Sequence, residues 1–217
     1  LNFNALRDFA PVSQVSATPH ILVTHPSLPP KTVKELVAFT RAHPGGLNYG
    51  STGHGNSDHL AAELFSYMTG LKMVHVTYKG GPLVLNDLLT GQIAMYFAGV
   101  PVALPFVKAG RVRALGVTGA TRTAVLPEVP TIAEAGVPGY EHILWGMLLV
   151  PAATPKDIVA RLNRETVKTL EAADVRERYA GMGVEPAPST PERAAAYLKS
   201  ETEKYAKVVK AIGLRIE

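Results

Sequence analysis

Short apolar segments alternate along the chain with segments in which apolar residues recur at helical spacing. The first apolar segment covers residues 20–25, and Val33, Leu36 and Val37 then mark one face of a predicted helix that ends before Pro44. This alternation of strands and helices is typical of α/β proteins with a mainly parallel sheet. Further strands are predicted at residues 47–51, 73–78, 92–97, 112–118 and 143–150, and a short helix at 132–135.

Proline and glycine gather between residues 120 and 139, which gives this segment the composition of a linker. Residues 19–138 are therefore expected to form one complete α/β lobe. The part that follows, residues 139–217, has two or three predicted helices and too few strands for a sheet of its own. Together with a remnant at residues 1–18, it is expected to belong to a first lobe that is incomplete. The missing strands of that lobe are expected upstream of the first residue or in a partner chain.

The composition narrows the classes of function. The 217 residues include 47% hydrophobic side chains and no cysteine, which excludes a disulfide framework and thiolate metal sites. The formal net charge of +4 comes from Lys and Arg mixed with acidic residues on the same predicted helices, so no basic cluster of the kind that binds nucleic acid is present. The longest apolar stretch, residues 142–153, is too short to span a bilayer and is predicted to be a buried strand.

The strongest candidate site is a turn rich in Gly, Ser and Thr, which follows the strand at 47–51 and opens the next helix. Glycines let the backbone approach a ligand closely, and unpaired N–H groups at a helix start attract negative charge. A tight turn with an ordinary helix cap would explain the same residues without a ligand. The residues predicted to bind an anion here are Ser51, Thr52, Gly53, His54, Gly55, Asn56 and Ser57.

Two further strand ends are expected at the same edge of the sheet, where ligand crevices form in α/β proteins. In the turn Tyr78 to Gly80, Tyr78 is expected to donate a hydrogen bond and Lys79 to supply a cation for a second carboxylate. A tyrosine at the core edge beside a solvent-facing lysine is an equally supported alternative. Phe97 and Ala98 begin a third loop, which offers a ligand only backbone amides and shape.

Other chemistries fit these residues less well. No Lys follows the glycines as in a P-loop, and the G-x-S-x-G pattern of a nucleophilic serine is missing, although a hydrolase that pairs Ser51 with His54 or His59 stays an alternative. Neighbouring Asp58 and His59 would point away from each other on a helix, so both are predicted to be solvated rather than to share a metal. The remaining histidines, His75 among them, show no spacing that suggests a shared role. No catalytic residue, metal site or cofactor is therefore predicted.

The candidate turns are part of a longer series of motifs that runs in order over nearly the whole chain. These motifs are Leu47-Asn48-Tyr49-Gly50-Ser51, His59-Leu60-Ala61, Val76-Thr77-Tyr78-Lys79-Gly80, Asp87-Leu88-Leu89-Thr90-Gly91-Gln92, Val107-Lys108-Ala109-Gly110, Leu126-Pro127-Glu128-Val129-Pro130-Thr131 and Pro151-Ala152-Ala153-Thr154-Pro155. With them the chain resembles the tripartite tricarboxylate transporter receptors, also called Bug-type solute-binding proteins.

The resemblance implies a periplasmic binding protein with two lobes, a type II-like Venus flytrap. Such a receptor captures dicarboxylates, tricarboxylates, amino acids or aromatic acids without a metal or cofactor, and it serves a membrane permease of a tripartite transporter or a sensor. The resemblance also puts the family's carboxylate loop at residues 51–57 and its Tyr-Lys-Gly turn at 78–80.

The chain departs from the family pattern in two places. Ala98-Gly99 stands where family members often carry Asp-Asn, and the family's opening segment, with a glycine loop of its own, is absent. These departures keep open a further alternative, a partner-binding fragment that self-associates through the incomplete lobe.

Overall fold

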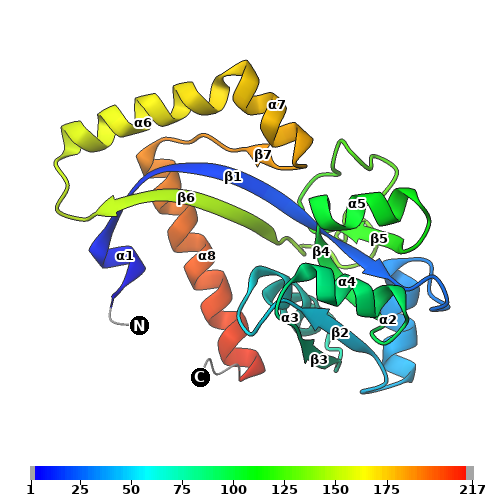
Figure 1. The fold of residues 1–217 in the computed structure, drawn as a ribbon. Helices are drawn as coiled ribbons and strands as arrows, with labels where there is room; N and C mark the ends of the chain where they lie inside the picture. Colours follow the sequence, from blue (N-terminus) through cyan, green and yellow to red (C-terminus); the bar gives the residue numbers. More distant parts are fainter. Residues whose placement is uncertain (1–2, 214–217) are drawn as a thin grey trace. The chain divides into compact units, whose positions relative to one another are not determined.

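The computed structural model describes residues 3–213, which divide into two compact units (Figure 1). One unit contains the described part of residues 1–18 together with Leu144–Lys207. The other contains Pro19–Ile143 and the described part of residues 208–217. No helix among the described residues is long and apolar enough to cross a membrane.

The unit around Pro19–Ile143 is built on a five-stranded mixed sheet in the order β3-β2-β4-β1-β5. β2 runs parallel to both β3 and β4, whereas β1 runs antiparallel to β4 and β5. Four strands therefore share one direction, and only β1 opposes them, a reversal that the sequence pattern did not predict. The strands are β1 (Phe9–Thr24), β2 (Asn48–Ser51), β3 (Val74–Thr77), β4 (Met95–Gly99) and β5 (Arg113–Val117).

Helices cover both faces of this sheet, because the side chains of the central strand β4 alternate between two apolar layers. Tyr96 and Ala98 belong to a core that also contains buried residues of α4 and α5. Phe97 points to the other face, where its ring lies 5.8 Å from that of Phe65 in α3 and 6.4 Å from that of Tyr140. The helices of this unit are α2 (Val33–Ala42), α3 (Ser57–Thr69), α4 (Gly81–Leu89) and α5 (Val100–Lys108).

Local sequence explains where these helices begin and end. The side chain of Thr32 accepts a hydrogen bond from the N–H of Glu35 and so caps the start of α2. Gly70 ends α3 in the left-handed conformation, with φ of 67°. Gly50 in β2 lets the sheet and its covering layer approach closely, because a Cβ there would lie 2.4 Å from Val84 and 2.6 Å from Ile93.

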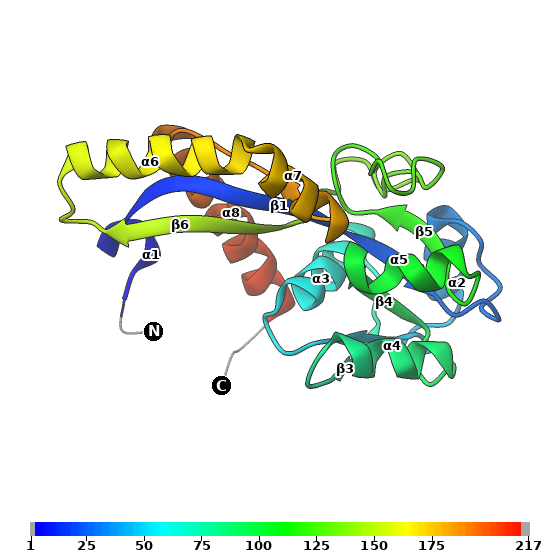
Figure 2. The ribbon, with the colours of Figure 1, turned by 45° about the horizontal axis from the view of Figure 1, so that its top comes forward.

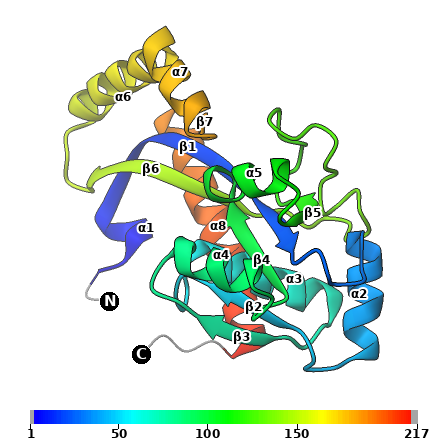
Figure 3. The same ribbon diagram turned by 45° about the vertical axis from the view of Figure 1, so that its right-hand side comes forward.

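The parallel register of β2 and β3 determines where the candidate site lies. Ser51 pairs with Thr77, so both strands end level with each other at one edge of the sheet. The loop before α3 follows β2, and the turn before α4 follows β3. Because these two strands are neighbours, the loop and the turn begin side by side, as Figure 3 shows. This is the juxtaposition that the sequence predicted for the two turns.

The other unit packs helices against the first half of β1 and against β6. Asn163 of α6 donates hydrogen bonds of 2.8 Å to the carbonyl oxygens of Val12 and Ser189, so α6 lies along β1 (Figure 2). The ring of Trp145 in β6 meets that of Tyr197 in α8 edge-on at 5.8 Å. The elements are α1 (Ala5–Asp8), β6 (Ile143–Pro151), α6 (Lys156–Glu171), α7 (Ala173–Gly181), β7 (Glu185–Pro186) and α8 (Pro191–Ile212).

Two strand boundaries and one predicted helix differ from the sequence analysis. β1 begins at Phe9, well before residue 20, because its first half pairs with β6 and β7. The strand predicted at 92–97 begins at Met95, because Gly91 with φ of 74° turns the chain and the N–H of Gln92 returns to α4. The short helix predicted at 132–135 is a series of turns.

Candidate functional site

The loop that opens α3 is organised around a buried carboxylate. Asp58, only 4% exposed, accepts hydrogen bonds from the backbone N–H and the hydroxyl of Thr52, at 2.8 and 3.0 Å, and from the N–H of His59 at 2.9 Å. The prediction that Asp58 and His59 are solvated was wrong, because both are buried. Since a carboxylate at a helix start interacts favourably with the helix dipole, Asp58 fills part of the cradle that the sequence assigned to a ligand.

Several of the predicted ligand residues use their side chains inside this loop. The hydroxyl of Ser51, fully buried, lies 2.6 Å from Nε2 of His75 and 3.3 Å from the N–H of Gly53. The amide of Asn56 donates to the carbonyl and hydroxyl oxygens of Thr52 at 3.0 and 3.2 Å. Ser51, Thr52 and Asn56 therefore shape the loop instead of presenting free side-chain donors.

Free donors remain where the loop enters the helix. Ser57 and Asp58 are the first two residues of α3, and their backbone N–H groups have no acceptor among the described residues. The hydroxyl of Ser57 lies 2.8 Å from Nε2 of His142, whereas the side chain of His54 is exposed. Because helix-start N–H groups carry partial positive charge, this entrance can bind an anion through main-chain atoms.

The glycines of the loop are required by its backbone. Gly53 and Gly55 have φ angles of 146° and 76°, which side-chain-bearing residues rarely adopt. The N–H of Gly55 donates to Nδ1 of His59 at 3.0 Å, so this glycine turn also sets the orientation of the imidazole. The structure gives the predicted glycines a conformational role beside any role in approaching a ligand.

Beneath the loop, aromatic rings from two strands and a helix form a cluster. The imidazoles of His59 and His75 stack at 4.1 Å, and the ring of Tyr49, nearly parallel to both, lies 5.0 Å from His75 and 6.3 Å from His59. His54 meets His59 and His75 edge-on at 5.6 and 4.9 Å. Burial, with a smaller contribution from neighbouring imidazoles, lowers the pKa of both His59 and His75 to about 4.

Among the described residues, His54, His59 and His75 form the one group of side chains placed closely enough to be considered for a metal site. One nitrogen from each ring lies within 4.8 Å of the others. The geometry does not suit a metal. The rings of His59 and His75 are within 20° of parallel, so their in-plane lone pairs do not converge on one point. In addition, Nδ1 of His59 accepts the N–H of Gly55, so this nitrogen is already used and the proton of the neutral ring is on Nε2.

The second predicted turn presents one unpaired cation. Tyr78 donates its hydroxyl to Asp87 at 2.8 Å, and burial together with this carboxylate raises the pKa of Tyr78 to about 12. The side chain of Lys79 is exposed and forms no ion pair with a described residue. Gly80, with φ of 134°, opens α4. The hydroxyl of the half-buried Tyr78 is thus used by Asp87, and Lys79 is the available charge at this sheet edge.

The third predicted loop begins later than the sequence suggested. Phe97 and Ala98 lie within β4, where they pair with Leu22 and Ile21, and both are fully buried. Their side chains therefore belong to the core on the two faces of the sheet.

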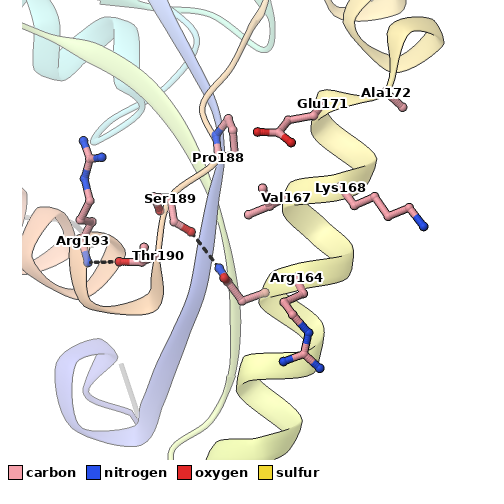
Figure 4. A pocket seen from close by; sticks show the side chains of 10 residues that line it. Arg164, Val167, Lys168, Glu171, Ala172, Pro188, Ser189, Thr190 and Arg193 are labelled. Carbon is pink, nitrogen blue, oxygen red and sulfur yellow. Dashed lines mark hydrogen bonds between the residues drawn. The ribbon is translucent and has the colours of Figure 1, made fainter.

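A separate groove of about 810 Å³ lies between α6 and the start of α8 (Figure 4). The side chains of Val167 and Glu171 point across it toward Pro188. Polar groups at its base already form hydrogen bonds within the protein. The amide of Asn163 donates to the carbonyl oxygen of Ser189, and the hydroxyl of Thr190 accepts from the N–H of Arg193. None of the residues predicted to bind a ligand lines this groove.

Comparison with known proteins identifies the family. Residues 1–214 match the model of the tripartite tricarboxylate transporter family receptor. The chain is similar to a UPF0065 protein in the tcbD-tcbE intergenic region of Pseudomonas sp., with 39% identity over 94% of this chain and 61% of the relative. It is similar to Protein BugT of Bordetella pertussis, with 33% identity over 99% of this chain and 66% of the relative. The chain thus spans roughly two thirds or less of the length of these curated relatives.

Solved structures agree in fold. Rpa4515 of R. palustris, determined with adipate, superposes with a TM-score of 0.83 at 35% identity, over 97% of this chain and 71% of that one. MatC of Rhodopseudomonas palustris, determined with bound malate, gives a TM-score of 0.81 at 29% identity, over 96% and 71%. The periplasmic binding protein BugD gives 0.79 at 26% identity, over 96% and 71%.

The prediction of an α/β periplasmic-binding-protein fold is confirmed, because this α/β chain superposes on the periplasmic binding protein BugD and on Rpa4515 with TM-scores of 0.79 and 0.83. The matched family and fold are those of solute-binding receptors and not of enzymes, so the hydrolase alternative is set aside even though Ser51 does contact an imidazole, that of His75. The chain belongs to the tripartite tricarboxylate transporter family of receptors, the Bug-type solute-binding proteins.

Proposed function

We propose that this chain carries the carboxylate-binding surface of a periplasmic receptor, and that the ligand is a small molecule with two carboxylates. The observation that carries the proposal is the pair of unpaired backbone N–H groups at Ser57 and Asp58, where α3 begins. They bind one carboxylate, with partial positive charge from the helix start. Lys79, on the turn beside them, attracts the second carboxylate.

The buried charge of Asp58 opposes an incoming anion, so its compensation matters. Three hydrogen bonds, two from Thr52 and one from the N–H of His59, are made to its two oxygens. Hydrogen bonds to a charged group are worth about 1.5–3 kcal/mol each, which is enough to hold the carboxylate in place inside the loop. The N–H groups of Ser57 and Asp58 then remain without an acceptor among the described residues, so that a ligand oxygen can accept hydrogen bonds from them.

The proposed ligand class, dicarboxylates, follows from the ligands named with two of the similar structures. Adipate, named with Rpa4515, and malate, named with MatC, are both dicarboxylates. Main-chain N–H groups bind a carboxylate and discriminate little between the groups attached to it, so amino acids, tricarboxylates and aromatic acids belong to the panel to be tested.

The proposal extends to the lobes and the partner. Residues 19–138 form the ligand-binding lobe, and residues 1–18 and 139–217 contribute to the other lobe; the compact unit Pro19–Ile143 supports this division. The receptor acts in the periplasm and delivers its ligand to the membrane permease of a tripartite transporter, as membership of the family suggests.

Isothermal titration of the chain with adipate, malate, citrate, glutamate and benzoate tests the function. Two variants of one residue separate the main-chain donor from the side chain. Ser57→Pro removes the N–H at the first helical position, where proline is tolerated, and the extended backbone of Asn56 before it suits a following proline. Ser57→Ala keeps the N–H and loses only the hydroxyl.

We expect dicarboxylate binding by the unmodified chain, nearly unchanged binding by Ser57→Ala, and about tenfold weaker binding by Ser57→Pro. No heat from any compound with folded protein would refute the proposal. Equal losses in the two variants would show that the hydroxyl, and not the N–H group, carries the contact.

A further inference from the structure

Two buried histidines lie beside the start of α3. His20 of β1 and His142, the residue before β6, are 4% and 2% exposed, and the centroids of their rings lie 5.2 Å apart. Nε2 of His142 lies 2.8 Å from the hydroxyl of Ser57, the first residue of α3. All three residues belong to the compact unit Pro19–Ile143. The two imidazoles therefore form a row that ends at the proposed anion site.

Strand register explains why the ring of His20 lies on this face of the sheet. Leu22 of β1 pairs with Phe97, whose ring lies against α3, and His20 pairs with Gly99 two positions further along the same face. The backbone N–H of His20 donates to the hydroxyl of Thr118 at 2.7 Å. Backbone pairing thus holds this imidazole on the side of the sheet that α3 covers.

One nitrogen of the pair has no hydrogen-bond partner. Nδ1 of His20 is buried and unpaired among the described residues. Buried polar atoms in proteins are nearly always paired, so an unpaired one calls for a functional explanation. Burial lowers the pKa of His20 to about 4, although the carboxylate of Asp58 acts in the opposite direction. At neutral pH the ring of His20 is uncharged and does not repel a proton on His142.

Two carboxyl groups lie near the pair. Asp58, buried on α3, favours a proton on His20, and Glu141 is exposed beside His142 in the chain. Thr118 offers the pair only a neutral hydroxyl. A ligand carboxylate at the N–H of Ser57 adds a further negative charge next to His142. Because a nearby negative charge favours the protonated form of an imidazole, ligand and proton are expected to bind together.

On the basis of the proposed function, we propose that His142 is a recognition residue of the anion site and that the His20–His142 pair takes up a proton as a dicarboxylate binds. The proton resides mainly on His142, the ring that contacts Ser57. Its charge adds to the partial positive charge of the helix start and acts through space, so it does not depend on the Ser57 hydroxyl. By linkage, proton and ligand strengthen each other's binding equally.

Isothermal titration with adipate in two buffers at pH 6.5 counts the protons. Each proton that the protein takes up is released by the buffer, so the measured heat should differ between PIPES, which ionises with little heat, and imidazole, which ionises with much. A rise of about tenfold in the proton affinity of one histidine makes adipate bind about twofold to threefold more tightly at pH 6.5 than at pH 7.5. Protonation of adipate itself acts in the opposite direction, because it removes charge from the ligand.

A matched pair of variants assigns the proton. His142→Gln keeps a polar side chain beside Ser57 but cannot take up a proton, so it should abolish both the buffer dependence and the tighter binding at pH 6.5. His43→Gln is the control and should retain both. His43 is exposed at the end of α2, before β2 begins, so it lies at the opposite sheet edge from Ser51, where β2 ends.

The outcomes separate this inference from the proposed function. Adipate binding with the same heat in both buffers would overturn proton uptake and leave the proposed function intact. Unchanged uptake in His142→Gln would overturn the role of His142. Absence of binding by the unmodified chain would refute the proposed function and this inference with it. Because the comparison of buffers uses the unmodified chain, it decides whether a proton is taken up even where His142→Gln does not fold.

Discussion

The carboxylate of Asp58 accepts hydrogen bonds from both the backbone N–H and the hydroxyl of Thr52, at 2.8 and 3.0 Å. These two residues stand at opposite ends of the glycine loop, so their contact closes it. The loop is therefore held in shape by its own carboxylate before any ligand arrives. A preformed loop loses less conformational entropy on binding, which favours affinity.

Replacing Asp58 by Asn should destabilise the protein by about 1–3 kcal/mol, because a charged acceptor is lost and an amide N–H₂ is brought toward a backbone N–H. Chemical denaturation followed by circular dichroism measures the change. Asp157→Asn, at an exposed residue in the first turn of α6, is the matched control and should stay within about 0.5 kcal/mol. Equal stability of Asp58→Asn and the unmodified protein would mean that the Thr52 contact contributes little.

The sequence predicts the place of the loop but not its internal chemistry. Glycines and helical spacing located the entrance to α3, because backbone conformation and local periodicity are properties of nearby residues. The residues around Asp58 in the sequence are compatible both with a solvent-exposed side chain and with one that faces the loop. Its burial could therefore not be predicted from the sequence. His75 reaches the loop only because β3 pairs with β2, which sets Tyr49 opposite His75. Such a cluster depends on strand register and leaves no spacing signal.

Lys79→Gln should weaken binding of a dicarboxylate by about twofold to fivefold, the range expected for one solvent-exposed ion pair. Benzoate, with a single carboxylate, should lose less affinity. The unfolding midpoint should not change, because Lys79 is exposed and makes no ion pair with a described residue. Calorimetry with adipate and benzoate on the variant measures both effects, and equal losses for the two compounds would assign Lys79 a general electrostatic role.

Gly50→Ala should cost about 1–3 kcal/mol of stability, since the added methyl group would lie 2.4 Å from Val84 and 2.6 Å from Ile93 in the packed core. Gly181→Ala is the control, because a Cβ there meets no atom within 4 Å. It should be neutral or slightly stabilising, through a less flexible unfolded chain. Urea denaturation compares the two, and a tolerated Gly50→Ala would mean that the layers around β2 can separate.

Zinc should not stabilise the protein through the cluster of His54, His59 and His75. Zinc-bound nitrogens lie about 2.0–2.1 Å from the ion along the ring plane, which the parallel rings of His59 and His75 do not allow. A thermal melt with excess zinc should shift by less than about 1 °C, because an ion that does not bind the folded state adds no stability. A larger shift that disappears in His75→Gln but persists in His25→Gln would reveal a metal site formed by ring rotation.

Acidification should destabilise the fold through its buried imidazoles. Burial lowers the pKa of His20, as it does for His59 and His75, from 6.5 to about 4. Between these values the unfolded chain binds protons that the folded chain does not bind. The contribution of these neutral imidazoles to the free energy of unfolding is therefore full above about pH 6.5 and falls as the pH drops toward 4. Denaturant midpoints measured from pH 7.5 down to 5.5 report mainly on the histidines, since carboxyl groups such as Glu134, whose pKa is lowered from 4.5, begin to contribute only as the pH approaches that value. His75→Gln should flatten the slope, because it removes one of these imidazoles; an unchanged slope would mean that the ring of His75 is protonated as easily in the folded protein as in the unfolded chain.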